Sequence, residues 1–326
     1  MSDFDAASVQ SFAIDLAKRA GKVILDGSSK RFADQATGQQ SSAADDLIKK
    51  NTADLVTEVD QATEEFVKAE IKRQYPSHKF IGEESWAAGQ QNQLEDAPSW
   101  IVDPIDGTTN FVTGFPFVAI SIGITYKSKA VIGVVYAPFL DTLFYAREGG
   151  GAFVESPQHR QARKLPLNQP LPLPSLKQAV VAVEWGSDRK LSTIDKKTKF
   201  FASLCGDADQ GVEGGQMVRG VRSIGSAALS CCFVAEGSLD LWHEIGCWIW
   251  DVCAGIVILQ EAGGLVVGAK QDTLDKIKAN SKELGTATPE ILQGRKYLVV
   301  RNTSPREDQI KTVTAFYQTM DEWNAA

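Results

Sequence analysis

Hydrophobic positions along the chain switch between helical and strand spacing, and the switches predict the elements. From about residue 5 to residue 25, apolar side chains recur at intervals of three and four, which predicts an amphipathic helix. Residues 26–46 are rich in Ser, Gln and Gly and predict a mobile loop or a broken helix end. A second helix is expected to start at Asp60 as its N-cap and to stop before Pro76.

A block of strand patterns follows these helices. KFIGEES and SWIVDPID read as two strand ends, each running into acidic residues. In FVAISIGITY, apolar residues alternate from Val118 to Ile124, which predicts a half-buried strand. AVIGVVYAP, TLFYAREGG and GAFVE then predict an antiparallel meander with Gly and Pro turns, and the Pro-rich residues 156–174 a surface connection.

The C-terminal part alternates strands with helices. AVVAVEWG reads as a strand, and the residues after it, as far as Gly215, are weakly patterned. The remaining predictions are a helix in GSAALSCCFVAEG, a strand in SLDLWHE, a helix in WDVCAGIVILQEAGG, strands in GLVVGA and KYLVVR, and a closing helix from about Pro305. Strands separated by helices in a chain of 326 residues predict stacked α and β layers.

Composition narrows the class of protein. A hydrophobic content of 43% and a charged content of 23% are ordinary for a globular protein, with one large domain or two packed subdomains. The start of the chain, MSDFDAASVQ, does not resemble a secretory signal, and no apolar run is long enough to span a membrane. The five cysteines form no CxxC pair, so we expect buried thiols in a reducing cytoplasm.

The net charge of -7 argues against nucleic acid or an anionic membrane as partner. An acidic protein that takes an anionic substrate must supply positive charge locally, from helix N-termini or bound cations.

Several carboxylates end apolar segments instead of lying on a solvated helical face: Glu83, Glu84, Asp103, Asp106 and Asp251. Each of them has a structural alternative, because Asp is common in turns and at helix caps. Taken together they would repel one another unless cations lie between them, and hard oxygen ligands select Mg²⁺, Mn²⁺ or Ca²⁺. With three histidines and no HxxxH or CxxC spacing, a zinc site is not expected.

The residues after Asp106 read GTTNF and suggest a place for an anion. Gly107 permits close approach of backbone, and Thr108 and Thr109 add hydroxyls. If a helix starts here, its N–H groups form an anion site, and metals beside that site describe a place for phosphate.

These stretches resemble the signatures of the inositol monophosphatase family. The similarity is carried by WIVDPIDGTTNFVTGFPFVAISIG, FIGEES, WDVCAGIVILQEAGG and DLVTEVDQATEEFV, and it runs from about Phe12 to Val300. The resemblance implies an α+β fold, a layered αβαβα sandwich in one domain over residues 1–326. It also implies a half with the metal and phosphate site, about residues 1–175, and a substrate-reading half, residues 176–326. A cytoplasmic homodimer that depends on Mg²⁺ and is inhibited by lithium is implied as well.

The resemblance also assigns metal ligands. Glu83, Asp103 and the Ile105 carbonyl would hold a first Mg²⁺, and Asp103, Asp106 and Asp251 a second. A third, weaker ion would lie near Glu83, which gives two to three ions per subunit.

The remaining roles concern water and substrate. Thr108, oriented by Asp60, would help Glu83 and the first metal to activate the attacking water. The N–H groups of Gly107 and Thr108 would hold the phosphate. The substrate would be contacted by Asp106, Asp251, Gly225, Ser226, Ala227 and Glu244.

Alternative roles remain open for several of these residues. Asp60 and Asp251 are also good helix caps, Glu84 suits a structural role, and Glu244 suits the polar edge of a strand. Lys49 and Lys50, which follow the polar insertion, are not assigned to the site.

The substrate is predicted from the residues after the aspartate pair. DPIDGTTNF favours an inositol monophosphatase over the adenosine bisphosphate phosphatases (DPIDGTKGF) and the fructose bisphosphatases. Broader activity on sugar, polyol or nucleotide monophosphates is the first alternative. A non-catalytic regulatory protein is the second, because fungi keep a paralogue of this family beside quinate-utilisation genes.

Overall fold

A computed structural model describes residues 4–36, 47–48, 55–56, 58–90 and 93–325. The chain divides into two compact units, which are described separately. The first consists of Met1–Lys164, Gly225–Leu229 and Ile249–Ile258, and the second of Leu165–Ile224, Ser230–Trp248 and Leu259–Ala326. The two contiguous halves expected from the sequence stay a prediction; these units differ from them because two short C-terminal segments group with the first unit.

A seven-stranded sheet forms the first unit, in the order β3-β4-β5-β6-β7-β8-β9. Strands β3 and β4 are parallel, and the other neighbours are antiparallel, so the predicted meander is confirmed. The bounds are β3 Lys79–Gly82, β4 Ser99–Asp106, β5 Ala119–Tyr126, β6 Lys129–Ala137, β7 Thr142–Arg147, β8 Gly151–Ser156 and β9 His159–Lys164. Strand β9 lies where only a surface connection was expected.

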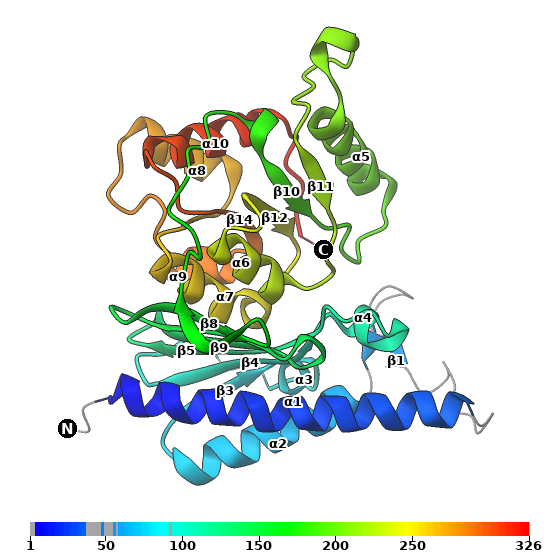
Figure 1. Ribbon diagram of the computed structural model, residues 1–326, viewed down its shortest axis with the longest axis vertical. Coiled ribbons are helices and arrows are strands. Elements are labelled where there is room, and N and C mark those ends of the chain that lie inside the picture. The colour runs from blue at the N-terminus through cyan, green and yellow to red at the C-terminus, as the bar shows by residue number, and fades with distance from the viewer. Residues whose placement is uncertain (1–3, 37–46, 49–54, 57, 91–92, 326) are drawn as a thin grey trace. The chain divides into compact units, whose positions relative to one another are not determined.

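Helices α1 (Ala6–Ala36) and α2 (Glu58–Gln74) cover one face of this sheet (Figure 1). The expectation that α1 ends near residue 25 is wrong. The helix continues because its polar extension still packs: a Cβ on Gly27 would lie 2.7 Å from Val59, and Ser28 is buried. Residues 37–46 of the expected loop, and Lys49 and Lys50, lie outside the described residues.

Helix α7 (Ile249–Glu261) packs on the other face of the sheet through its first part. Gly123 of β5 and Gly133 of β6 are paired in register. A Cβ on Gly123 would lie 2.5 Å from Cys253 Sγ, and one on Gly133 would lie 2.1 Å from the Ala254 carbonyl oxygen. Strand β5 is therefore buried on both faces from Ala119 to Thr125, which corrects the expected half-buried strand.

The first unit also contains several short elements. They are α3 Glu83–Ala87, α4 Thr108–Thr113, the 3-10 helix η1 Pro138–Leu140 and the pair β1 Leu47–Ile48 and β2 Leu55–Val56. Helix α6, Ala227–Glu236, starts in the first unit and continues in the second. None of the described helices combines the length and apolar character needed to cross a membrane.

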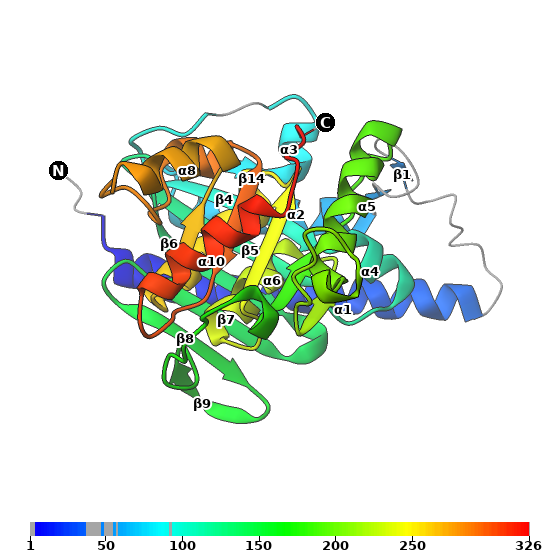
Figure 2. The ribbon, with the colours of Figure 1, turned by 90° about the horizontal axis from the view of Figure 1, so that it is seen from above.

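The second unit has a five-stranded mixed sheet in the order β11-β10-β12-β14-β13. Its strands are β10 Val180–Val183, β11 Gly220–Arg222, β12 Leu241–Ile245, β13 Leu265–Val267 and β14 Lys296–Val300. Its helices are η2 Leu176–Gln178, α5 Leu191–Cys205, η3 Ala208–Gln210, α8 Lys270–Lys278, α9 Pro289–Gln293 and α10 Glu307–Gln318. Helices α8 and α10 lie side by side (Figures 1 and 2).

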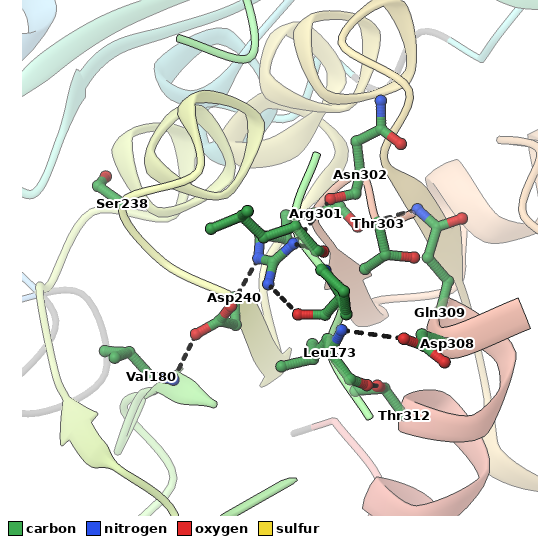
Figure 3. A network of polar contacts seen from close by, with 12 residues as sticks. Leu173, Val180, Ser238, Asp240, Arg301, Asn302, Thr303, Asp308, Gln309 and Thr312 are labelled. Carbon is green, nitrogen blue, oxygen red and sulfur yellow. Dashed lines mark hydrogen bonds and ion pairs between the residues drawn. The ribbon is translucent and has the colours of Figure 1, made fainter. Parts of the chain in front are cut away.

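A half-buried ion pair joins the strands of this second sheet (Figure 3). Arg301 Nε donates to Asp240 Oδ1 at 2.5 Å, and Asp240 Oδ2 accepts from the Val180 N–H at 2.6 Å. Asp308 of α10 accepts from the Leu173 N–H at 3.0 Å. Arg301 also donates to the Leu171 carbonyl at 2.8 Å, so the Pro-rich segment before β10 is held against the end of β14 and the start of α10.

Candidate active site

Three carboxylates of the first unit meet at the end of β4. One oxygen each from Asp103, Asp106 and Asp251 lies within 4.8 Å of the other two. Asp103 and Asp106 are 2% and 6% exposed, and Asp251 is half-buried. The structure thus brings together residues that lie about 150 positions apart in the sequence.

The strand end that carries the first two aspartates is a reversal as well as part of this cluster. Asp103 Oδ1 accepts from the Ile105 N–H at 2.9 Å, an Asx-type turn, and the register with β5 shifts between Asp103 and Asp106. The turn interpretation and the site interpretation of DPID therefore hold together.

Asp251 reaches the cluster through the packing of α7. Ser121 pairs with Asp103 across the sheet, and its hydroxyl donates to the carbonyl of Trp250 at 3.0 Å. The helix starts at Ile249, so Asp251 lies in its first turn. Ser121 thus ties the residue next to Asp251 to the strand beside Asp103.

The electrostatics of the cluster are those of crowded anions. Burial raises the pKa of Asp103 well above its ordinary value, and the charges of Glu83, Asp106 and Asp251 raise it further. Glu83 is therefore close enough to act on the cluster, at the start of α3 directly after β3. Such an arrangement needs positive charge between the carboxylates.

Asp106 is held at the N-terminus of α6. Its carboxylate accepts from the Ser226 hydroxyl and from the N–H groups of Ala227 at 3.2 Å and Ala228 at 2.8 Å. Burial raises the pKa of Asp106 to about 7, although these hydrogen bonds lower it. Ser226 and Ala227, predicted to contact substrate, are thus bonded to a predicted metal ligand.

Thr108 links the turn after Asp106 to helix α2. Its hydroxyl lies 3.2 Å from Asp60 Oδ1 and 3.1 Å from the Ile105 carbonyl oxygen. Asp60 is 1% exposed and lies in the first turn of α2, after Glu58. The expectation that Asp60 is the N-cap is therefore wrong, because the helix begins before it, at Glu58.

Gly107 closes the turn in a backbone conformation that suits glycine. Its φ is +97°, and a Cβ would lie 2.9 Å from the Phe117 carbonyl oxygen and 3.0 Å from that of Gly225. Asn110 Nδ2 donates to the same two oxygens, at 2.8 and 3.4 Å. Gly225, another predicted substrate residue, thus lies against the turn that follows Asp106.

Glu244 lies in β12 of the second unit and is 8% exposed. Its Oε1 and the Lys197 Nζ would lie 3.4 and 3.5 Å from a Cβ on Gly186. Burial lowers the pKa of Lys197, while the charge of Glu244 raises it. Within this unit two buried side chains of opposite charge therefore lie near Gly186, and the charge of one acts on the other.

Three residues that position segments of the site were not identified from the sequence. Ser121, Asn110 and Glu64 each position a segment of the first unit through a partner distant in the chain, which for Glu64 is the main chain of Glu84, and the sequence pattern does not identify those partners. The spacing of Asp60, Glu64 and Lys68 by four residues along one helical face is the signal that was available for Glu64.

The donor set fits a hard divalent cation. Carboxylate and carbonyl oxygens are the ligands that Mg²⁺ takes, and Asp103, Asp106, Asp251, Glu83 and the Ile105 carbonyl belong to neighbouring segments of one unit. The mutual repulsion of the buried carboxylates is the physical reason to expect such an ion.

Comparisons with known proteins agree with this geometry. The family model described as the inositol monophosphatase family matches residues 5–304. The chain belongs to the inositol monophosphatase family. It is 38% identical to Protein qutG of Emericella nidulans, over 97% of this chain and 92% of that protein. It is 36% identical to inositol monophosphatase 1 of Saccharomyces cerevisiae, over 97% of both.

Solved structures of the inositol monophosphatase family confirm the fold class, an α+β layered sandwich. Inositol monophosphatase II of Staphylococcus aureus superposes with a TM-score of 0.65 at 27% identity and 95% coverage of each chain. Membership supports a phosphatase, and the family is generally Mg²⁺-dependent, in keeping with the acidic cluster.

Proposed function

We propose that this protein is a Mg²⁺-dependent phosphomonoesterase that hydrolyses inositol 1-phosphate to inositol and phosphate. The observation that carries the proposal is the cluster of Asp103, Asp106 and Asp251 directly before the Gly107–Thr108 turn. The cluster suits cations, and the turn suits the phosphate that those cations would attract.

Metal binding is assigned to five groups. Glu83, Asp103 and the Ile105 carbonyl would hold one ion, Asp103, Asp106 and Asp251 a second, and a third, weaker ion would lie near Glu83. When bound, the ions lower the pKa of water and stabilise charge on the leaving oxygen. The hydrogen bonds that Asp106 accepts from α6 fix that carboxylate in one orientation, which favours a preformed site.

Activation of the attacking water is assigned to Thr108, Asp60 and Glu83. When the Thr108 hydroxyl donates to Asp60, its oxygen is able to accept a hydrogen bond from water. The water proton would then pass through Thr108 to Asp60 as the water oxygen bonds to phosphorus. The ester bond would break, and the leaving alcohol oxygen would take up a proton from solvent water.

Substrate contacts are assigned to the residues that the resemblance to the family implies. The N–H groups of Gly107 and Thr108 would hold the phosphate beside Asp106 and Asp251. Gly225, Ser226, Ala227 and Glu244 would contact the hydroxyls of the polyol. Ser226 would do so while it bonds to Asp106, since a hydroxyl has one proton and two lone pairs.

Inositol 1-phosphate is proposed as substrate because of the GTTNF sequence and the name of the yeast relative. The relative named qutG supports two alternatives, since its name states no phosphatase activity. The first alternative is a phosphatase for other sugar, polyol or nucleotide monophosphates. The second is a non-catalytic regulatory protein.

The test is phosphate release with and without Mg²⁺. We expect release from inositol 1-phosphate that Asp103→Asn lowers at least about 100-fold, because metal stabilisation is worth several kcal/mol. Asp195→Asn, on the exposed side of α5, is the matched control and is expected to retain activity. Normal activity of the Asp103 variant would refute the metal assignment.

A substrate panel separates the candidates. It contains inositol 1-phosphate, glycerol 2-phosphate, galactose 1-phosphate, histidinol phosphate and adenosine 3′,5′-bisphosphate. The highest kcat/KM on inositol 1-phosphate supports the proposal, and a higher value on another ester supports the broader phosphatase. No release from any of them, with Mg²⁺ bound, supports the non-catalytic protein.

We also propose a cytoplasmic homodimer that lithium inhibits and that binds neither nucleic acid nor membranes. The resemblance to the family supports the homodimer and the lithium inhibition. The cysteine content supports the cytoplasm, and the net charge of -7 argues against nucleic acid and anionic membranes. Sedimentation at micromolar concentration tests the dimer, and a lithium titration of the phosphatase assay tests the inhibition.

A further inference from the structure

Helix α2 carries a buried carboxylate that is not among the proposed metal ligands. Glu64 is 3% exposed and lies one helical turn after Asp60. Its Oε2 accepts from the Glu84 N–H at 2.7 Å, and its Oε1 accepts from the Ser85 N–H at 2.7 Å and the Ser85 hydroxyl at 2.6 Å. Both oxygens are therefore turned to the first turn of α3.

These contacts replace a cap that α3 lacks. The residue before the helix is Gly82, which has no side chain to accept from the first N–H groups. A Cβ at Gly82 would lie 2.4 Å from Glu64 Oε2, so the glycine makes room for the carboxylate. Glu64 thus acts as the N-terminal cap of α3 from a different helix.

Lys68 extends the same contact by one more turn of α2. Its Nζ lies 3.0 Å from the Ser85 hydroxyl oxygen and 2.9 Å from Gln90 Oε1. The two ends of the segment from Ser85 to Gln90 are thereby held against α2. The start of α3 is consequently fixed in direction as well as in position.

Glu83 lies between the capped residues and the strand end. Gly82 pairs with Val102 in the parallel register of β3 and β4, so Glu83, the first residue after β3, follows its strand at the level of Asp103, which is still part of β4. The charge of Glu83 already acts on Asp103. Because the main chain on both sides of Glu83 is fixed, by the sheet and by Glu64, its carboxylate has a restricted set of directions.

We propose that Glu64 is a positioning residue that holds Glu83 toward the divalent metal. This inference rests on the proposed function, because it takes Glu83 as a metal ligand. Glu64 itself touches neither metal nor substrate; it acts through the peptide groups of Glu84 and Ser85. Groups that orient a metal ligand typically change metal affinity about 10- to 100-fold when they are lost.

The protein contains its own reporter of this region. Trp86 of α3 and Trp250, the neighbour of Asp251, lie with their ring centroids 5.8 Å apart. One ring follows Glu83 and the other precedes Asp251, so a cation that draws the two carboxylates together changes the surroundings of both rings. Tryptophan fluorescence then measures Mg²⁺ binding without substrate, and Trp86→Phe identifies the responding signal.

The experiment compares Glu64→Ala, Glu64→Gln and Ser85→Ala with wild type in Mg²⁺ titrations. Glu65→Ala is the matched control, because Glu65 is the adjacent residue of α2 and is exposed. We expect Glu64→Ala to raise the Mg²⁺ concentration for half-saturation about 10-fold or more. Glu64→Gln and Ser85→Ala are expected to raise it less, since each keeps part of the cap, and Glu65→Ala to leave it within about 2-fold of wild type.

A second readout separates positioning from general destabilisation. At saturating Mg²⁺, the KM and kcat of Glu64→Gln are expected within about 2-fold of wild type, because metal binding restores the direction of Glu83. If Glu64→Ala does not fold, the Gln and Ser85 variants decide the question through the same titrations. Half-saturation equal to that of the Glu65 control in every folded variant would overturn the inference.

The proposed function fails in a different way. If wild type shows no Mg²⁺-dependent change in fluorescence, the metal site and this inference are both wrong. If wild type binds Mg²⁺ and the Glu64 variants bind it equally well, the inference alone is wrong. If wild type binds Mg²⁺ and the Glu64 variants bind it weakly while no ester is hydrolysed, the inference holds and the phosphatase assignment is wrong.

Discussion

Gly107 lies directly after Asp106 and begins the turn that follows the carboxylate cluster. It combines a positive φ with two main-chain oxygens at the place of a Cβ. Gly107→Ala is expected to lower the free energy of unfolding by about 1–3 kcal/mol and to abolish phosphate release, because the turn must open. Gly89→Ala is the control: its φ is +91°, and nothing lies within 4 Å of a Cβ there. Equal effects of the two substitutions in urea unfolding and activity assays would contradict the role of the oxygens.

His243 of β12 gives a pH dependence at the residue scale. Burial, and next the charge of Lys197, lower the pKa of His243 from 6.5 to about 3. Below pH 6.5 the unfolded chain therefore binds a proton that the folded chain refuses, so this residue lowers stability as the pH falls toward 3.

The size of this effect follows from the width of the window. Between pH 7 and pH 5, wild type is expected to lose about 2 kcal/mol more of its free energy of unfolding than His243→Gln. Urea unfolding of both proteins at the two pH values measures the difference. The same loss in both would show that His243 does not titrate in this way.

Among the contacts between elements, the packing of α7 on the seven-stranded sheet determines where Asp251 lies. Gly133→Ala places a methyl group 2.1 Å from the Ala254 carbonyl oxygen, so the helix or the strand must move. We expect a loss of about 1–3 kcal/mol in unfolding free energy and weaker Mg²⁺ binding, because Asp251 moves with the helix. Gly268→Ala, where the nearest atom is 3.4 Å away, is expected to do neither. Unchanged Mg²⁺ binding in Gly133→Ala would contradict this account.

Elements with a strong period were predictable from the sequence, and those held by distant partners were not. The strand ends at Gly82 and Asp106 and the meander were predicted because alternation and turn residues are local signals. Helix α5 was missed because only Thr193, Lys197, Phe200 and Leu204 are buried in it, too weak a stripe to detect. The last third of α1 was missed because polar, Gly-containing sequence favours a loop, and the packing of Gly27 against Val59 is a contact with a distant residue.

The carboxylates of the site could be predicted from the sequence, but the residues that position them could not. Asp103, Asp106 and Asp251 were identified from motif order, and the structure brings them together. The roles of Ser121, Asn110 and Glu64 depend on contacts with Trp250, Gly225 and Glu84, and local spacing does not identify these partners.

At the scale of the whole molecule, the first unit is not one continuous piece of chain. Its residues 249–258 supply Asp251 and the helix that covers Gly123 and Gly133. A fragment of residues 1–175 lacks this helix and exposes one face of the seven-stranded sheet to water. We expect it to show no cooperative unfolding transition and no Mg²⁺ binding, and calorimetry with a Mg²⁺ titration measures both. A fragment that unfolds cooperatively would favour two halves divided near residue 175.

The close packing of Cys253 against Gly123 also means that strand β5 covers the Cys253 sulfur atom. Burial raises the pKa of the Cys253 thiol to about 12, so in the packed state it is protonated and out of reach of alkylating reagents. Modification then requires α7 to separate from β5. The rate of Cys253 alkylation therefore measures how often the helix that carries Asp251 separates from the sheet. An ion that binds Asp251 together with the aspartates of β4 must lower this rate.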